Sequence, residues 1–281
     1  MDAVSLAATS ALLFGAMTVA IRIALTRGAT AEAGALVTVL AAFAVALPFA
    51  LVQGVDIVEL WPFVLAGLLG PGLSQLLFVL AVREAGPSRT SVVVGTAPLF
   101  SVVIALIFLD EPLLAGLAVG ALLIVAGGLL LVGERGRPEH VRVLGLLLAL
   151  AATVVFAVRD NFVRWLAVDT EVAPGAAVMA TLGAGAAVIA VYLVVTRAPV
   201  RARDARAFAP AGLLFGLSYV CLFEAYYRGP VSVVSPLVAT ESLWGVLLSA
   251  LVLKRSENVG LRLAAGAVLV VLGGILIGVF R

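Results

Sequence analysis

The sequence predicts an all-α polytopic membrane protein whose ten transmembrane helices form two inverted five-helix repeats. Hydrophobic residues make up 63% of the 281 residues and charged residues only 12%, which leaves too little polar surface for a soluble globule of this size. The apolar runs are about 20 residues long, the length that a helix needs to cross roughly 30 Å of hydrocarbon. These runs are continuous rather than alternating, so they do not fit the strands of a transmembrane barrel.

The apolar runs predict five spans in each half of the chain. The first five cover residues 3–25, 31–52, 60–82, 88–109 and 112–133. The second five cover residues 143–165, 173–196, 208–228, 231–252 and 259–280. The polar stretch between the two sets divides the chain into a first repeat (1–134), a linker (135–141) and a second repeat (142–281).

Two stretches of the chain are diverged copies of one segment. The first copy reads Gly72-Leu73-Ser74, then Gly86-Pro87, and the second reads Gly216-Leu217-Ser218, then Gly229-Pro230. Both Gly-Pro steps predict tight hairpins, because Pro cannot continue a helix and Gly supplies the turn. Such a duplication in an apolar chain is typical of an internally repeated transporter.

The repeat also includes the first span of each half. Phe14 and Arg22 align with Phe156 and Arg164 at an offset of 142 residues. The repeat therefore covers whole halves of five spans. Because five is odd, the second copy enters the membrane from the opposite side, which predicts an inverted repeat.

The basic residues predict the orientation in the membrane. Fourteen of the 18 Lys and Arg residues fall in loops that follow odd-numbered spans. Since basic residues resist translocation, these loops are expected in the cytoplasm and both termini outside it, in a multi-pass protein of the cytoplasmic (inner) membrane. The pI of about 9.0 then reflects loops beside anionic lipid rather than nucleic-acid binding.

Motifs for catalysis or for a bound cofactor are absent from the sequence. The single cysteine, Cys221, lies in an apolar span, and the single histidine, His140, lies in the linker. There is no phosphate-cradling loop, nucleophile elbow or ATP motif. We therefore expect no enzyme activity, no metal, no cofactor and no drive by ATP bound to this chain.

The residues resemble the EamA family of the drug/metabolite transporter superfamily over essentially the whole chain. The paired halves, the Gly-Pro turns and a Glu-x8-Gly-x6-Gly-Gly pattern carry the resemblance. That pattern occurs as Glu111, Gly120 and Gly127-Gly128, and again as Glu257, Gly266 and Gly273-Gly274. The family often has Glu-Pro in the fourth span of each repeat, whereas this chain has Ala97-Pro98 and Glu241-Ser242. The resemblance implies secondary transport of small metabolites, frequently the export of amino acids or related compounds.

Glu241 is the strongest candidate for a substrate-binding or proton-exchanging residue. It lies near the middle of the ninth span, where an ionisable side chain costs roughly 2.5–3.5 kcal/mol and must face a partner or a wet cavity. A structural alternative is a protonated carboxyl group that bonds a neighbouring helix. Trp244 follows by three residues, on nearly the same helix face, and could stack on the substrate.

Arg159, Asp160 and Asn161 form a second polar group near the end of the sixth span. Adjacent residues of a helix point about 100° apart, so Arg159 is expected to pair with Glu224 of the eighth span rather than with Asp160. Such a pair would fix or gate the bundle, whereas Arg159 could alternatively hold a substrate carboxylate. Asp160 and Asn161 are expected to line the cavity.

Ser74 and Gln75 follow Gly70-Pro71-Gly72 in the third span. This sequence frees backbone groups and lets the helix bend or break, as often happens beside a transport site. The repeat places Ser218 and Tyr219 at the matching positions of the eighth span. Ser74, Gln75 and Tyr219 are therefore expected to bind substrate, with close helix packing as the alternative.

Together these features predict a secondary transporter that exports an amino acid or a similar metabolite by alternating access, with protons as a candidate coupling ion. Its partners are the substrate and the lipid bilayer. A passive facilitator, or a small multidrug or lipid-carrier flippase, is the alternative. A lipid-modifying enzyme is disfavoured, because its loops would carry clusters of Asp, Glu or His and these loops are short and poor in them.

Overall fold

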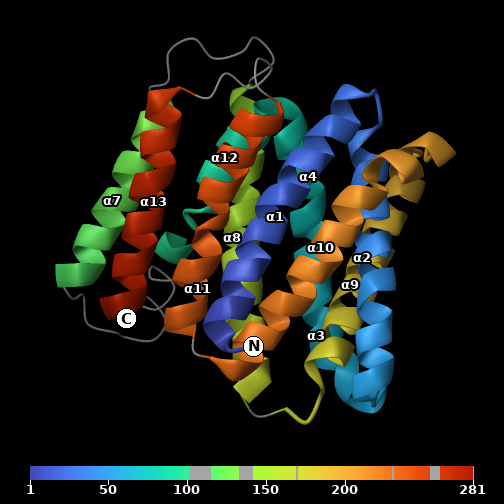
Figure 1. Cartoon of the computed structure of the whole chain (residues 1–281). Helices are drawn as coiled ribbons and strands as arrows, with labels where there is room; N and C mark the ends of the chain where they lie inside the picture. Colours follow the sequence, from blue (N-terminus) through green and yellow to red (C-terminus); the bar gives the residue numbers. More distant parts are fainter. Residues whose placement is uncertain (101–114, 133–141, 169, 230, 254–259, 281) are drawn as a thin grey trace.

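The computed structural model describes residues 1–100, 115–132, 142–168, 170–229, 231–253 and 260–280 (Figure 1). The linker at 135–141, with His140, and the two glutamates of the repeated pattern, Glu111 and Glu257, lie outside these residues. The described regular elements are helices. In chain order they are α1 (Ala3–Thr26), α2 (Ala31–Gln53), η1 (Val58–Leu60), α3 (Trp61–Gly67), η2 (Leu68–Leu73), α4 (Ser74–Ala85), α5 (Pro87–Val94), α7 (Ala115–Val132), α8 (Val143–Val168), α9 (Pro174–Thr196), α10 (Ala202–Arg228), α11 (Val231–Ala239), α12 (Glu241–Val252) and α13 (Leu261–Phe280).

Seven stretches of the described chain are helical, long enough and apolar enough to cross a membrane. They are Ala3–Thr26, Ala31–Gln53, Val58–Ala85, Val143–Val168, Pro174–Thr196, Ala202–Arg228 and Val233–Val252. Two shorter apolar helical stretches, Ala118–Gly127 and Leu261–Ile277, accompany them. The chain is therefore a polytopic α-helical membrane protein, as its sequence predicts.

The bounds of α1, α2 and α9 agree with the predicted spans to within one residue, but α10 begins earlier than expected. The apolar run predicts a start at residue 208, whereas α10 begins at Ala202. The carboxylate of Asp204 accepts hydrogen bonds from the backbone N–H groups of Arg201 at 3.0 Å and Thr30 at 3.3 Å. This cap lets the helix begin within a polar segment, which hydropathy does not register.

The third predicted span is interrupted at Gly70, as the Gly-Pro-Gly sequence predicts. Residues Leu68–Leu73 form a wider π-helical turn, and Gly70 has the non-helical dihedral angles φ −137° and ψ 116°. The N–H of Ser74 bonds to the carbonyl oxygens of Leu69 and Pro71. The Gly70 carbonyl is thus freed from the hydrogen-bond ladder of the helix.

The ninth predicted span is interrupted as well, at Thr240, which separates α11 from α12. The Thr240 hydroxyl donates to the Leu237 carbonyl at 2.6 Å. In the first half, Thr96 donates to the Val93 carbonyl, also at 2.6 Å, directly after α5. A threonine hydroxyl that bonds back to the preceding turn competes with the helix and bends it. Hydropathy predicts one uninterrupted span over residues 231–252, because threonine is not a strong helix breaker.

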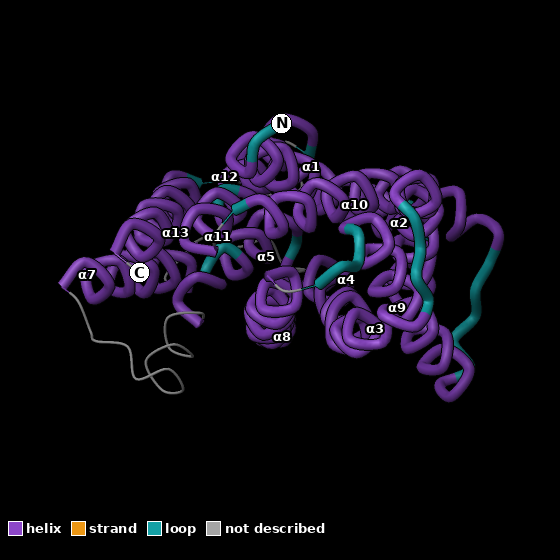
Figure 2. The backbone as a smooth tube through the Cα atoms, turned by 90° about the horizontal axis from the view of Figure 1, so that it is seen from below, coloured by secondary structure: helices purple, strands orange, loops and turns teal. Residues whose placement is uncertain are grey.

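The helices pack as a bundle with two flanking pairs. Helices α7 and α13 pack together at one side, and α2 and α9 at the opposite side (Figures 1 and 2). Between them, α1 packs on α10 and α12, α4 packs on α8, and α5 packs on α12. The two chain termini lie at the same end of the bundle (Figure 1).

Glycines allow α7 and α13 to approach backbone to backbone. A side chain at Gly120 would meet the Gly273 carbonyl oxygen at 2.8 Å, and one at Gly273 would meet the Gly120 carbonyl oxygen at 2.5 Å. A side chain at Gly127 would likewise meet the Gly266 carbonyl oxygen at 2.7 Å. Residue numbers rise along one helix as they fall along the other, so the two helices are antiparallel. Small residues at such crossings let membrane helices pack closely.

The crossing predicts that Gly273→Ala lowers the free energy of unfolding by about 1–3 kcal/mol, because the added methyl group must displace a backbone carbonyl. Denaturant unfolding of the purified protein in mixed micelles measures the change. The matched control is Gly274→Ala in the same helix, whose methyl group would meet its nearest atom, in Pro98, at an ordinary 3.4 Å. Equal stability of the two variants would contradict the prediction.

Candidate functional site

A small cavity lies at the centre of the bundle. Its volume is about 40 Å³, which leaves room for only a few water molecules. The lining comes from α1, α8, α10, α11 and α12, together with residues at and just beyond the end of α5. The lining residues are Ser10, Phe14, Val94, Ala97, Phe156, Arg159, Asp160, Tyr219, Leu222, Val238 and Glu241. The cavity thus brings together four of the residues that the sequence singles out: Arg159, Asp160, Tyr219 and Glu241.

Arg159 is buried and forms an ion pair with its neighbour in sequence. Its Nε and Nη2 atoms lie 2.7 and 2.6 Å from Oδ1 of Asp160. The guanidinium carbon lies 5.1 Å from the ring centroids of both Phe156 and Tyr219, within range of cation–π attraction. The pair is therefore enclosed by aromatic rings, where an unpaired charge would be costly.

The expected pair between Arg159 and Glu224 is wrong. Glu224 accepts from Arg228, four residues later on α10, at 2.5 Å and from the side-chain amide of Gln53 at 2.9 Å. The prediction failed because it considered only the 100° between adjacent side chains on a helix. An arginine side chain is long enough to fold back onto the carboxylate of the next residue.

Tyr219 connects the ion pair to the interrupted third span. Its hydroxyl accepts a hydrogen bond from Nη1 of Arg159 and donates one to the Gly70 carbonyl at 3.3 Å. That carbonyl is the one freed by the π-helical turn of η2. The hydroxyl therefore satisfies a buried backbone group and fixes the guanidinium, joining η2, α8 and α10.

Glu241 enters the cavity from the break in the ninth span. It is the first residue of α12 and is only 6% exposed. Among the described residues none forms an ion pair with it. The N-terminus of α12 favours a negative charge on Glu241, because the free backbone N–H groups of the first helical turn give this end of the helix a partial positive charge. Glu241 is thus a buried acid that faces the cavity without a protein cation as partner.

Ser74 and Gln75 lie at the interrupted segment but do not line the cavity. Both side chains are fully buried, and among the described residues neither Ser74 Oγ nor the Gln75 amide has a hydrogen-bond partner. A side chain at Gly70 would meet Ser74 Oγ at 3.1 Å and the Arg159 side chain at 3.2 Å. Ser74 is therefore near Arg159, beside the break, and substrate contact by Ser74 or Gln75 stays a prediction.

Asn161 and Trp244 also lie outside the cavity lining. The Asn161 amide donates to the Ala157 carbonyl, one turn earlier, at 2.8 Å. Trp244 faces α1, where a side chain at Gly15 would meet its Cβ atom at 2.7 Å. Trp244 thus marks a close approach of α1 and α12, and a stacking role for it stays a prediction.

Sequence reasoning missed Ser10 as a cavity residue. Its hydroxyl lies 3.0 Å from the hydroxyl of Ser218, which also donates to the Ser10 carbonyl at 2.9 Å. The available signal was Phe14, one helical turn later on α1 and aligned by the repeat with Phe156. The rings of Phe14 and Phe156 meet edge to face, with centroids 6.1 Å apart, in the cavity wall.

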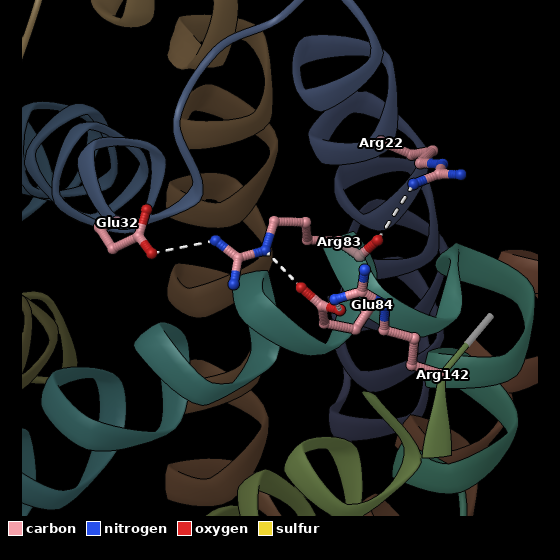
Figure 3. Close-up of polar contacts among 5 residues, drawn as sticks. All are labelled: Arg22, Glu32, Arg83, Glu84 and Arg142. Carbon is pink, nitrogen blue, oxygen red and sulfur yellow. Dashed lines mark hydrogen bonds and ion pairs between the residues drawn. The ribbon is translucent and has the colours of Figure 1, made fainter. Parts of the chain in front are cut away.

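Sequence reasoning also missed a polar cluster at one end of the bundle (Figure 3). Glu84, near the end of α4, accepts from Arg83 at 2.8 Å and from Arg142, just before α8, at 3.2 Å. Arg83 also pairs with Glu32 of α2 at 3.0 Å, and its carbonyl accepts from Arg22 of α1 at 3.4 Å. This cluster, which we call the Glu84 cluster, joins α1, α2, α4 and the start of α8.

The geometry predicts that Tyr219→Phe lowers the free energy of unfolding by about 1–2 kcal/mol, because the Gly70 carbonyl and Arg159 each lose a buried partner. Denaturant unfolding in mixed micelles measures the loss. Tyr192→Phe on α9 is the control, because its hydroxyl has no hydrogen-bond partner within the described chain. A Tyr219→Phe variant as stable as Tyr192→Phe would refute the proposed role of the hydroxyl.

Comparison with solved structures agrees with the fold. Twenty-six chains of solved structures match this chain. One of them, described only as the crystal structure of a protein, superposes with a TM-score of 0.71 and is 24% identical. The match covers 98% of this chain and 95% of that one, and at this identity it shows the fold alone. No curated protein matches this chain.

The model of the EamA-like transporter family matches residues 1–133 and again residues 143–279. The two matches together take in nearly the whole sequence, including every residue that lines the central cavity. Members of this family are membrane transporters rather than enzymes. This chain belongs to the EamA-like transporter family.

Proposed function

We propose that this transporter is a secondary active exporter of a small metabolite that bears an amino group, an amino acid or a related compound. In this proposal ten spans form two inverted repeats, residues 1–134 and 142–281. The substrate binds in the central cavity, which opens to one side of the membrane at a time (alternating access). Protons are the proposed coupling ion. The observation that carries the proposal is Glu241, a buried acid that faces the cavity without a partner cation among the described residues.

The glycine crossing of α7 and α13 supports the inverted arrangement. Sequence alignment makes Gly120 equivalent to Gly266 and Gly127 equivalent to Gly273. Gly120 meets Gly273 and Gly127 meets Gly266. Replacing each glycine of one contact by its equivalent in the other repeat therefore gives the other contact. The equivalent helices are antiparallel, as a two-fold axis in the membrane plane requires.

A second pair of equivalent contacts supports the same arrangement. Arg22 donates to the carbonyl of Arg83, three residues before Gly86, at 3.4 Å. Its counterpart Arg164 donates to the carbonyl of Tyr226, three residues before Gly229, at 2.5 Å. Each arginine thus holds the end of the third span in its repeat, a contact that neither interfacial anchoring nor chance composition would duplicate.

Two polar clusters are the proposed gates. The Glu84 cluster ties α1, α2, α4 and α8 at one end (Figure 3). Near the end of α10, Glu224 pairs with Arg228 and Gln53, and Gln53 also accepts from the Gly175 N–H at 2.7 Å. Both clusters are formed at once while the cavity is only about 40 Å³ in volume, which fits an occluded state.

Substrate coupling through Glu241 predicts that Glu241→Gln slows pH-gradient-driven uptake into liposomes by about tenfold or more, because an ammonium or proton loses its charged partner. Purified protein is reconstituted and given a panel of labelled amino acids and amines, with and without a pH gradient. Glu59→Gln, which changes an exposed carboxylate away from the cavity, is the control.

Unchanged uptake in both Glu241→Gln and Asp160→Asn would refute a role for these carboxylates. Uptake that equilibrates equally with and without the gradient would instead identify a passive facilitator. Movement of lipid in place of soluble substrates would favour the flippase alternative. The gradient and lipid outcomes are measured on one preparation of the unmodified protein, so its folding and reconstitution are shared between these two tests.

The charge asymmetry predicts that the first turn of α10, with Arg203, is on the cytoplasmic side and that the segment after α2, with Glu59, is on the other side. In a Cys221→Ala background, Arg203→Cys should react with a membrane-impermeant maleimide only after cells are permeabilised. Glu59→Cys should react in intact cells. Both positions are exposed, so access is set by the side of the membrane. The reverse pattern would overturn the proposed orientation.

A further inference from the structure

The charges of the central cavity do not balance, and this imbalance bears on which compounds it can hold. Arg159 supplies the only positive charge among the lining residues, while Asp160 and Glu241 are both acidic. With both carboxyl groups ionised, the lining therefore carries one net negative charge. An enclosed site in low-dielectric surroundings favours a ligand that cancels this charge.

Each of the three side-chain nitrogen atoms of Arg159 already has a partner within the protein. Its Nε and Nη2 atoms bond to Asp160 at 2.7 and 2.6 Å, and its Nη1 atom donates to the Tyr219 hydroxyl. The Phe156 and Tyr219 rings lie near the guanidinium group, each at 5.1 Å. A ligand carboxylate that used the remaining N–H groups of Arg159 would share its one positive charge with Asp160, and would therefore add a buried negative charge without a cation of its own.

Glu241 is the cavity acid that Arg159 does not pair with. It is 6% exposed and lines the cavity together with a wall of apolar and aromatic side chains. That wall is made by Phe14, Val94, Phe156, Leu222 and Val238. A ligand that matches these surfaces has one ammonium group to meet Glu241 and an apolar body to meet the wall.

We propose that the cavity selects lipophilic monoamines that carry no free carboxylate, and that it discriminates against free amino acids. The proposal rests on the proposed transport function and narrows its substrate class. A free amino acid is disfavoured because its carboxylate would face Asp160 and Glu241, and like-charge juxtaposition is a strong means of rejecting a wrong ligand.

The test uses three compounds that share a phenylethyl group and differ in their ionised groups: 2-phenylethylamine has an ammonium group, 3-phenylpropionate has a carboxylate, and phenylalanine has both. Isothermal titration calorimetry measures their binding to the purified full-length protein at pH 7. The amine should bind, phenylalanine should bind at least about tenfold more weakly, and 3-phenylpropionate should show no binding. Phenylalanine that binds as tightly as the amine, or an amine that does not bind, would overturn the proposal.

Two variants test the origin of the selectivity. Glu241→Gln should remove amine binding, whereas Glu59→Gln at an exposed position should leave it unchanged. Asp160→Asn frees Arg159 and should shift the ratio of affinities toward phenylalanine by about tenfold or more. A ratio that does not move in folded Asp160→Asn protein would overturn the assigned role of the ion pair. If that variant does not fold, the three-compound series on the unmodified protein and on Glu241→Gln decides.

Transport in liposomes separates this proposal from the function on which it rests. Selective binding of the amine without transport of any of the three compounds would refute the transporter proposal and leave the selectivity intact. Gradient-driven transport with phenylalanine preferred would support the transporter proposal and refute the selectivity.

Discussion

The central site depends on one constraint, which is that a polar group inside hydrocarbon must find a partner within the protein. The third span breaks its hydrogen-bond ladder at Gly70 and leaves a carbonyl without its helical donor. Tyr219 supplies a hydroxyl to that carbonyl and, through the same oxygen, holds Arg159. Arg159 in turn neutralises Asp160. A break in one helix thus determines how two charged side chains on another helix are held beside the cavity.

The flank of the bundle and the central site differ in how their helices are built. Where α7 crosses α13, small residues remove side chains altogether, so that carbonyl groups of one helix face glycines of the other. Around the cavity, α5 and α11 each end near a threonine whose hydroxyl bonds back to its own helix. These interruptions leave polar groups near the middle of the bundle. The crossing of α7 and α13 therefore provides rigidity at one flank, while the interrupted helices provide the chemistry at the centre.

Much of the fold could be predicted because hydropathy and helix length are tightly linked in a membrane. The bounds of α1, α2 and α9 follow from that link, and the break at Gly70 follows from Gly-Pro-Gly. Polar partners were harder to predict. The Arg159–Asp160 pair depends on a side-chain rotamer, and the Glu84 cluster joins residues far apart in sequence. Spacing along a helix contains neither kind of information, so both were missed.

The differences between equivalent positions then acquire a physical meaning. Ala97 and Glu241 are equivalent in the alignment, and both line the cavity. An acid at both positions would add a second buried charge without a partner, whereas alanine at one leaves a single carboxyl group for one cation. Gln75 and Tyr219 are also equivalent and differ in their contacts. The Tyr219 hydroxyl bonds to the Gly70 carbonyl, whereas the Gln75 amide is buried without a hydrogen-bond partner among the described residues. Duplication supplies the walls of such a cavity, and divergence of a few of the lining residues sets its charge.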